Sequence, residues 1–411
     1  MKKGVFHKIW LSFAALCGCI LLSVGYFQFS LPETYTVPKG QELTVGRWIA
    51  GQAVNVDGRA ASAVVQVGEE YRADLRLMGL FPVKQVTVSV AEPHSVMVCG
   101  IPFGIKLYTD GVLVVGMSDV ETAAGGVNPA AAAGVCVGDT ILAINGEEVT
   151  TSRDVTRLVN ACGGKAVTLH LRRDGVEFDA TFTPARPAGE SGYRMGMWVR
   201  DSTAGVGTLT FYDPQSGAFA GLGHAMCDAD TGKVMTLSEG EIVPARIFGV
   251  HKSVAGAPGE LNGCFEAGSL GELYVNGSQG LYGLLTATPQ GWQTLPVAAR
   301  QQVKVGTAQV LTTLDGTTPQ LYDIEILQIK YGGLNATRHM VIRVTDSRLL
   351  TLAGGIVQGM SGSPIIQNGK LVGAVTHVLV DDPTRGYAIF AENMLETAQS
   401  VADEHELKEA S

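Results

Sequence analysis

The segment Gly359-Met360-Ser361-Gly362-Ser363-Pro364-Ile365 constrains the fold of this chain more than any other stretch. Glycines beside a serine allow a sharp backbone turn, and such a turn can direct main-chain N–H groups toward one point. Residues 365–376 follow as two apolar stretches around Asn368-Gly369, which is typical of a β-hairpin. The sequence therefore predicts a serine on a tight loop that a hairpin holds in place.

A glycine-rich histidine segment, Gly221-Leu222-Gly223-His224-Ala225-Met226, lies far upstream of this loop. A serine hydroxyl is a weak nucleophile until a base takes its proton, and histidine has a pKa near neutrality. We therefore predict acyl-transfer chemistry with Ser361 as nucleophile, His224 as general base and the main-chain N–H groups of Gly359 and Ser361 as oxyanion hole. Ser363 is expected to be a structural neighbour. The histidines that compete with His224 are His251, His339 and His377.

Length and charge set the broad class of the protein. A chain of 411 residues predicts two or three domains, and its net charge of −9 argues against nucleic acid as a partner. The seven cysteines include no CxxC pair and are not spaced as metal ligands, so neither a metal nor an organic cofactor is expected. A single disulfide, Cys227–Cys264, is one alternative, and buried free thiols are the preferred interpretation for most of the cysteines.

The first 31 residues differ in composition from the rest of the chain. A basic start, Met1-Lys2-Lys3, precedes an almost wholly apolar run from Ile9 to Phe29. A helix of about 20 apolar residues spans a bilayer core of roughly 30 Å. We interpret residues 1–31 as a signal-anchor with the chain after Pro32 outside the cytoplasm. The alternative is a cleaved signal peptide, which gives the same compartment.

The next segments are predicted to be small β-rich units. Residues 32–94 alternate apolar and polar positions and predict a β-rich module with an exposed linker. Residues 95–186 combine an alanine helix ended by Gly134, an alternating strand from Thr140 to Ile144, and a helix that ends at Gly163. This order resembles a PDZ domain of the bacterial protease type.

A PDZ domain binds extended peptides by β-augmentation at a strand edge. Phe103, Gly104 and Ile105 occupy the expected place of its carboxylate-binding loop, so we predict peptide binding there. The alternative is a PDZ domain that docks internally and only tethers or gates its neighbour. Residues 187–411 contain many short strands between Gly and Asp turns, and predict a pair of β-barrels.

Taken together, these motifs resemble one known family. The membrane segment, the PDZ domain, the His224 segment and the Ser361 loop occur in the order found in the stage IV sporulation protein B peptidase of endospore-forming bacteria. The resemblance covers nearly all of the chain after the membrane segment. It implies a mainly β fold, with a PDZ domain followed by a chymotrypsin-like double β-barrel and one N-terminal transmembrane helix.

The resemblance also implies a function and a compartment. The enzyme is a serine endopeptidase of the forespore membrane, with its catalytic part in the space between forespore and mother cell. It cuts itself and then a membrane-bound regulatory partner of an intramembrane protease. The resemblance places the orienting acid at Asp346, only fifteen positions before the serine. Asp228 and Asp230 are rivals for that role, and a Ser–His dyad is a further alternative.

Rival functions differ in class. A non-catalytic PDZ adaptor with a peptidase-like barrel would assemble membrane proteins without cutting them, but Ser361 and His224 are both in place. A heat-shock-type quality-control protease carries its PDZ domain after the barrel, whereas here it comes before. A carboxy-terminal processing protease uses a Ser–Lys pair, and this sequence has no lysine in a matching motif.

Overall fold

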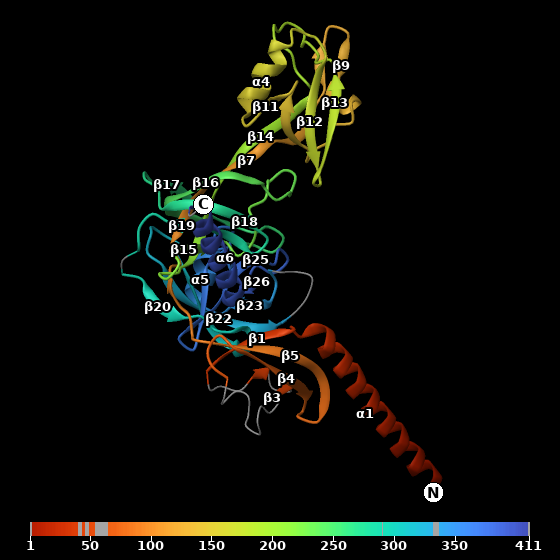
Figure 1. Ribbon diagram of the computed structural model, residues 1–411, viewed down its shortest axis with the longest axis vertical. Coiled ribbons are helices and arrows are strands. Elements are labelled where there is room, and N and C mark those ends of the chain that lie inside the picture. Colours follow the sequence, from red (N-terminus) through yellow and green to blue (C-terminus); the bar gives the residue numbers. More distant parts are fainter. Residues whose placement is uncertain are drawn as a thin grey trace.

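The computed structural model describes residues 2–39, 43–45, 49–53, 65–289, 291–331 and 337–409. Helix α1 (Lys2–Ser30), a small sheet, a pair of barrels and an outer domain follow one another along the longest axis of the molecule (Figure 1). Apart from α1 and a few shorter helices, the described chain is built of strands. The mainly β fold predicted from the sequence is confirmed.

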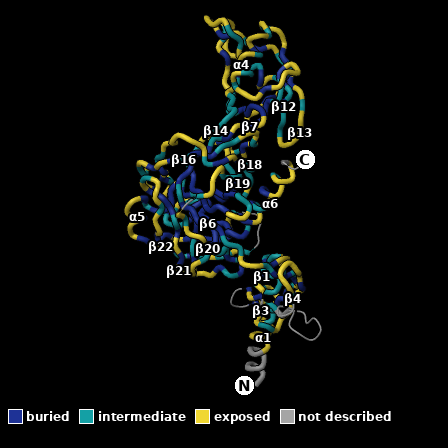
Figure 2. Tube along the Cα trace, turned by 60° about the vertical axis from the view of Figure 1, so that its left-hand side comes forward, coloured by how far each residue is buried: buried dark blue, intermediate teal, exposed yellow. Residues whose placement is uncertain are grey.

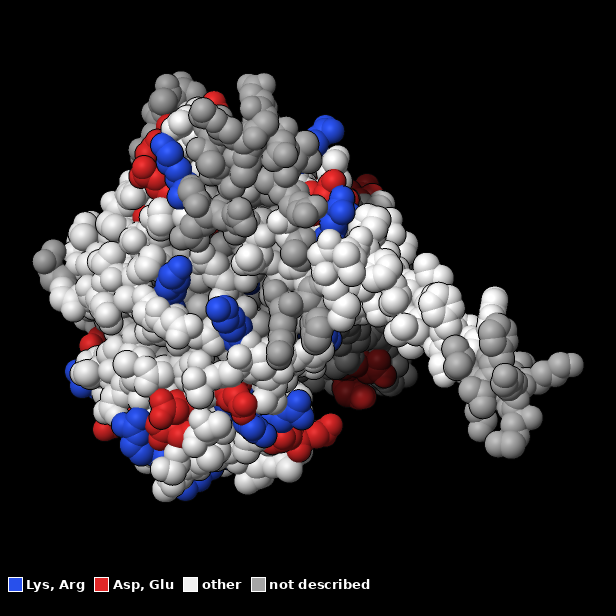
Figure 3. Space-filling view, turned by 90° about the horizontal axis from the view of Figure 1, so that it is seen from below, with Lys and Arg blue, Asp and Glu red and all other residues white. Residues whose placement is uncertain are grey.

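Helix α1 is long and apolar enough to cross a membrane once. Its span Trp10–Ser30 has a mean hydropathy of 1.9 over the most apolar window and contains no Asp, Glu, Lys or Arg. At about 1.5 Å per residue this span matches a hydrocarbon core of roughly 30 Å. Figure 3 shows the described part of this helix as an uncharged projection from the charged body.

The described residues between 31 and 91 form a folded module around one five-stranded sheet. The sheet has the order β1-β5-β4-β3-β2, and β1 runs parallel to β5. Its strands are β1 (Thr34–Pro38), β2 (Thr44–Val45), β3 (Ile49–Ala53), β4 (Glu70–Leu77) and β5 (Phe81–Ala91). An exposed linker within this segment stays a prediction. Residues 54–64 lie outside the described residues, and only 92–94 separate the module from the next strand.

The first barrel is closed by the pairing of its two longest strands, β7 and β14. In the order around the barrel, its strands are β7 (Pro102–Met117), β16 (Leu237–His251), β18 (Gly271–Gly277), β19 (Gly280–Leu285), β15 (Ala218–Gly221) and β14 (Met197–Tyr212). Strands β6 (Ser95–Val98), β17 (Glu260–Phe265) and β20 (Gln293–Pro296) extend this sheet. Phe103, Leu209 and Phe219 fill its interior and are fully buried. Figure 2 shows buried segments, in dark blue, gathered in the region of the barrels.

The second barrel closes on itself. Its strands, in order, are β21 (Gly306–Thr312), β22 (Gln320–Ile329), β23 (Met340–Val344), β26 (Arg385–Phe390), β25 (Lys370–Val378) and β24 (Pro364–Gln367). Helix α5 (Ser347–Ala353) follows β23, and the terminal helix α6 (Ala391–Glu409) packs on β15 and β19 of the first barrel as well as on β25. The predicted double barrel is confirmed, and α6 joins its halves through a shared core.

The PDZ-like domain is inserted between the two strands that close the first barrel. Its elements are β8 (Val120–Thr122), β9 (Gly125–Val127), α3 (Pro129–Ala132), β10 (Thr140–Ile144), β11 (Glu147–Glu148), α4 (Ser152–Ala161), β12 (Val167–Arg173) and β13 (Val176–Phe182). Strand β7 enters it and β14 leaves it, paired from Met197↔Met117 down to Thr208↔Pro102. The sequence analysis placed a PDZ domain at 95–186 and a peptidase domain at 187–411. In the structure the first barrel instead takes strands from both sides of the PDZ-like domain.

The predicted peptide-binding residues Phe103, Gly104 and Ile105 lie inside the first barrel. Strand β14 pairs with one edge of β7 at these positions and β16 with the other, so no edge is free for a peptide. The Phe103 and Ile105 side chains belong to the barrel core, whereas Val112 and Val114 on the same strand belong to the core of the PDZ-like domain. The prediction was wrong because one uninterrupted strand serves both domains.

The cysteines are all free thiols. Cys227 and Cys264 are exposed and unpaired, so the alternative of a disulfide between them is not realised. Of the seven, only Cys99 is buried. Buried thiols are thus the exception here.

Shortening Phe103 should destabilise the protein without touching the PDZ-like domain. Removing a fully buried aromatic ring costs about 3–5 kcal/mol. We expect Phe103→Ala to lower the free energy of unfolding by that amount in urea titrations followed by circular dichroism. Tyr108→Ala on the same strand is the control, because Tyr108 is 50% exposed. Equal stability of the two variants would contradict the placement of Phe103 in the core.

Candidate active site

The nucleophile loop connects α5 to β24 and depends on glycine at two positions. Gly359 and Gly362 have φ angles of 94° and 92°, in the left-handed region that favours glycine. A Cβ atom on Gly362 would lie 2.0 Å from the carbonyl oxygen of Thr208 and 2.5 Å from the nitrogen of Leu222. Glycine therefore lets the loop of the second barrel press against the backbone of the first.

Strand β14 holds this loop through hydrogen bonds. The Thr208 N–H donates to the Ser361 carbonyl at 3.0 Å, and the Thr208 hydroxyl donates to the Gly359 carbonyl at 2.8 Å. Two residues along, the Thr210 hydroxyl donates to the Gly362 carbonyl at 2.7 Å. The serine thus sits at the junction of the barrels, on a loop whose carbonyl groups are held by the opposite barrel.

We call residues 222–236, which follow β15, the histidine loop. Its first residues turn sharply, with φ angles of 63° at Leu222 and 70° at Gly223. A Cβ atom on Gly223 would lie 3.0 Å from Cγ2 of Thr376, on strand β25 next to the nucleophile loop. The close approach of Gly362 to Leu222 and of Gly223 to Thr376 brings the histidine and serine loops together.

His224 is held in the tautomer that a general base needs. Its Nδ1 lies 2.8 Å from the carbonyl oxygen of Ala225, and a carbonyl can only accept, so Nδ1 carries the proton and donates it. In the neutral ring Nε2 therefore keeps its lone pair. Burial lowers the pKa of His224 below its usual value, with the Ala225 hydrogen bond acting in the opposite direction. The imidazole is therefore neutral and ready to accept a proton at neutral pH.

Ser361 is partly exposed and its hydroxyl has another partner. The Ser361 Oγ donates to the Thr376 carbonyl at 2.8 Å. Among the described residues it makes no hydrogen bond to His224. The structure therefore shows a resting arrangement, because attack requires the hydroxyl to turn toward the base. Catalytic hydrogen bonds often tighten only when substrate binds.

The His377 ring stacks against the His224 ring, with centroids 4.8 Å apart and planes tilted by 36°. Burial, followed by the charges of His224 and Arg338, lowers the pKa of His377 to about 4. Its Nδ1 is buried and has no hydrogen-bond partner among the described residues. His377 was an alternative base in the sequence, but its place here is beside the base. The position of His377 in the sequence, at the end of the nucleophile hairpin, indicated that it would lie near Ser361.

The two main-chain donors predicted for the oxyanion hole are unoccupied by any described residue. Within the described part of the chain, the main-chain N–H groups of Gly359 and Ser361 have no hydrogen-bond acceptor. The neighbouring N–H groups are occupied, since Met360 donates to Val357 and Gly362 to Val375. Two free donors flanking the nucleophile are what stabilisation of a tetrahedral oxyanion requires.

The structure does not bring Asp346 to His224. Asp346 is the N-cap of α5, and its carboxylate accepts from the Arg348 backbone and side chain and from the Asp323 N–H at 3.2 Å. The hydrogen bond from Arg348 chiefly holds the pKa of Asp346 far below its usual range. A carboxylate at the start of α5 is fixed within the second barrel, so the role that the resemblance implied is not supported here.

The other candidates also have structural partners. Asp228 and Asp230 both pair with Arg200 on β14, and Asp228 in addition accepts from Thr231. His339 is buried and stacks on Phe390 at 4.9 Å. The described residues therefore place no carboxylate on His224, and a Ser–His dyad fits the geometry best.

Ser363 is fully buried, which agrees with its expected structural role. Its hydroxyl lies 2.9 Å from the Thr312 hydroxyl on β21 and 3.4 Å from that of Thr208 on β14. The side chain thus ties the nucleophile loop to both barrels. It offers no accessible oxygen for attack on a substrate.

The open strand edge of the PDZ-like domain lies on β14 beside α4. In its first half β14 pairs only with β7, and a cavity of about 400 Å³ lies between its Val199 and helix α4. That cavity is lined by Ser152, Arg153, Thr156, Arg157, Asn160 and Val199. Sequence reasoning missed this edge because β14 begins after residue 186. Gly196, with a φ of 86° just before the strand, was the available signal.

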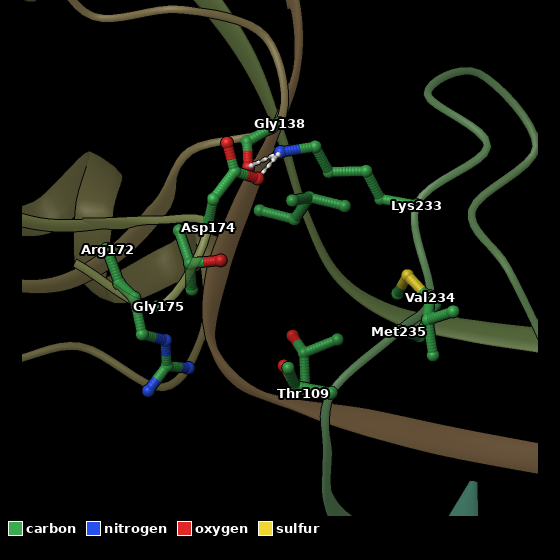
Figure 4. A pocket seen from close by; sticks show the side chains of 11 residues that line it. Thr109, Gly138, Arg172, Asp174, Gly175, Lys233, Val234 and Met235 are labelled. Carbon is green, nitrogen blue, oxygen red and sulfur yellow. Dashed lines mark hydrogen bonds and ion pairs between the residues drawn. The ribbon is translucent and has the colours of Figure 1, made fainter. Parts of the chain in front are cut away.

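The PDZ-like domain also touches the histidine loop. Lys233 donates to the Asp174 carboxylate at 3.0 Å and to the Gly138 carbonyl at 3.3 Å (Figure 4). These residues border a cavity of about 300 Å³ between the domain and the loop, whose wall also includes Thr109, Arg172 and Met235. The segment that carries the base therefore rests partly on the PDZ-like domain.

No group of His, Cys, Asp and Glu suited to a metal ion occurs in the described ranges. The chemistry predicted for Ser361 and His224 would not require one, because in acyl transfer by a serine a histidine takes the serine proton and free N–H groups receive the oxyanion. The site is therefore suited to acyl transfer by a serine nucleophile.

Comparisons with known proteins assign a family to the part of the chain that carries Ser361 and His224. Residues 191–395, about half of the chain, match the family described as SpoIVB peptidase S55, and residues 128–173 match a PDZ domain. A Mesorhizobium japonicum protein named as a putative zinc metalloprotease is 42% identical over 57 residues, which are 14% of this chain and 16% of that protein. The chain thus spans a small part of this curated relative.

Two solved structures are similar to parts of this chain. The active form of the Rv3671c protease from M. tuberculosis is 17% identical, with a TM-score of 0.29, over 49% of this chain and 74% of that chain. The PDZ domain of the SdrC-like protein from Listeria monocytogenes is 19% identical, with a TM-score of 0.18, over 22% of this chain and 87% of that chain.

A fluorophosphonate probe should separate the roles of the three candidate residues. We expect Ser361→Ala to abolish labelling because the nucleophile is gone. Asp346→Ala should keep labelling while losing about 1 kcal/mol of stability, because it removes a helix cap. Ser363→Ala should also keep labelling, since its hydroxyl is buried. Loss of labelling in a folded Asp346→Ala protein would restore Asp346 to the mechanism.

The pH dependence of labelling should report the environment of His224. The active form is the neutral imidazole, and burial lowers the pKa of this group, so activity should persist as the pH falls below 6.5. We expect the acid limb of the labelling rate to have its midpoint below pH 6.5. A midpoint above that value would indicate a carboxylate beside His224 and would contradict the dyad.

Proposed function

Because the chain belongs to the SpoIVB peptidase S55 family, we propose that it cuts itself and a membrane-bound regulatory protein during endospore formation. The protein is a serine peptidase with a PDZ domain. In this proposal α1 anchors it in the forespore membrane, and the barrels act in the space between forespore and mother cell. The regulatory protein belongs to an intramembrane protease complex that the cut releases.

The observation that carries the proposal is the meeting of the two loops. Gly362 lies against Leu222 and Gly223 lies against Thr376, so the serine of one barrel and the base of the other share one site. Free N–H groups at Gly359 and Ser361 lie beside the nucleophile. An acyl-enzyme reaction needs these three parts and no others from the protein.

Two further features support cleavage of a membrane-bound partner. Helix α1 fits a bilayer, which would keep the enzyme and a membrane-bound substrate at one surface. The open edge of β14 beside α4 suits an extended peptide, and the same strand continues to Thr208 and Thr210, which hold the nucleophile loop.

Self-cleavage is tested with the full chain in detergent. Wild-type protein should shorten with time, while Ser361→Ala protein stays intact, and N-terminal sequencing of the products identifies the bond. Mixing the two proteins then shows whether a cut occurs between molecules. If the wild-type protein stays intact but is labelled by fluorophosphonate, self-cleavage is rejected while the serine peptidase function remains supported.

The adaptor alternative has one observation in its favour. The Ser361 hydroxyl is bonded to the Thr376 carbonyl instead of to His224. If the folded wild type resists the probe, the proposed peptidase function fails and the adaptor remains. If labelling appears only after a peptide is added, the resting arrangement is a regulated state.

A further inference from the structure

Asn276 on β18 makes three hydrogen bonds to the histidine loop. Its Oδ1 accepts from the Met226 N–H at 2.7 Å, and its Nδ2 donates to the carbonyl groups of Met226 at 2.9 Å and Met235 at 2.8 Å. Met226 lies near the start of the loop and Met235 near its end. One side chain from a regular strand therefore links the start and the end of the loop that carries the base.

The Met226 N–H and the Ala225 carbonyl belong to one peptide group. In a trans peptide the C=O and N–H bonds point in opposite directions, so their two dipoles are aligned and add. A continuous chain of hydrogen bonds results, since His224 Nδ1–H donates to the Ala225 oxygen at 2.8 Å and the Met226 N–H donates to Asn276. Hydrogen bonds in such a chain polarise one another.

This chain occupies the place that a carboxylate has in a triad. A triad aspartate accepts from Nδ1–H, fixes the tautomer and stabilises the imidazolium that forms. The described residues place no carboxylate there, and Asp346 is paired with Arg348. The Ala225 carbonyl accepts the Nδ1 proton instead, and Asn276 fixes the peptide to which that carbonyl belongs.

We propose that Asn276 is a positioning residue for His224, acting through the Ala225–Met226 peptide. When Ser361 attacks, the serine proton moves to Nε2 of His224 and the ring becomes positive. The Nδ1 atom keeps its own proton, which remains hydrogen-bonded to the Ala225 oxygen. Asn276 keeps that oxygen directed at the ring and makes it a stronger acceptor. The proposal deepens the proposed function and rests on its serine peptidase chemistry.

Few titratable groups face His224. His377 of β25 stacks on its ring, the charge of Arg338 acts on His377, and the Cys227 thiol shares the Ala225 carbonyl at 3.8 Å. Asp228 follows in the same loop but is buried against Arg200. A carboxylate introduced at position 276 would therefore be the main new charge acting on the base.

The test measures fluorophosphonate labelling rates of the full-length protein in detergent as a function of pH. We expect Asn276→Ala to slow labelling about tenfold to a hundredfold, which is at most the lower limit of the 10²–10⁴ that a general base contributes, because the base itself remains. Asn276→Asp keeps the acceptor for the Met226 N–H and adds a negative charge. It should retain more activity than Asn276→Ala and move the acid limb to higher pH, because a nearby anion stabilises the imidazolium.

Asn145→Gly is the matched control. Asn145 also bonds a backbone N–H through its side chain, at 2.9 Å to Thr168, and glycine accepts its φ of 53°. It lies in the PDZ-like domain, so its labelling rate should equal that of the wild type. Thermal unfolding checks each variant, and if Asn276→Ala does not fold, the pH profile of Asn276→Asp decides.

Two results would overturn the positioning role while leaving the peptidase intact. One is a folded Asn276→Ala protein that labels at the wild-type rate. The other is an Asn276→Asp protein whose acid limb coincides with that of the wild type. An unlabelled wild type is a different result, because it rejects the serine peptidase chemistry itself and the positioning role with it.

Discussion

The antiparallel pairing of β7 with β14 is the interaction on which the rest of the structure depends. It closes the first barrel, and it carries the PDZ-like domain as an insertion between its two strands. The far end of β14 then supplies Thr208 and Thr210, whose hydrogen bonds hold the nucleophile loop of the second barrel. A shift of β14 along β7 would therefore move three features together: the open edge of β14 beside α4, the closure of the first barrel, and the loop that carries Ser361.

Local signals in the sequence were sufficient for most elements and for the turns around Ser361 and His224. Glycines around Ser361 and His224 mark turns whose φ angles the structure confirms as left-handed at Gly223, Gly359 and Gly362. Apolar alternation marked the strands, and the apolar run marked α1. These features are readable because each depends on residues that are neighbours in the chain.

Non-local features were beyond the sequence. Nothing in Pro102–Met117 indicates that one strand passes from one core into another, so Phe103 was assigned to the wrong domain. Asp346 has the residue type of a catalytic acid, but whether it reaches His224 depends on how the two barrels pack, and in the structure it pairs with Arg348. Asn276 has no motif, because its role depends on where β18 lies relative to the histidine loop. Such relations are set by packing alone.

The module of residues 31–91 has a geometric consequence, because it separates α1 from the barrels (Figure 1). With α1 in a bilayer, this folded sheet acts as a spacer of fixed height. The catalytic centre then works at a set elevation above the lipid, and the PDZ-like domain lies farther out still. The proposed membrane-bound substrate would have to present its scissile segment at that height. The length of its juxtamembrane stalk would then be a criterion for selection, independent of the residues around the bond.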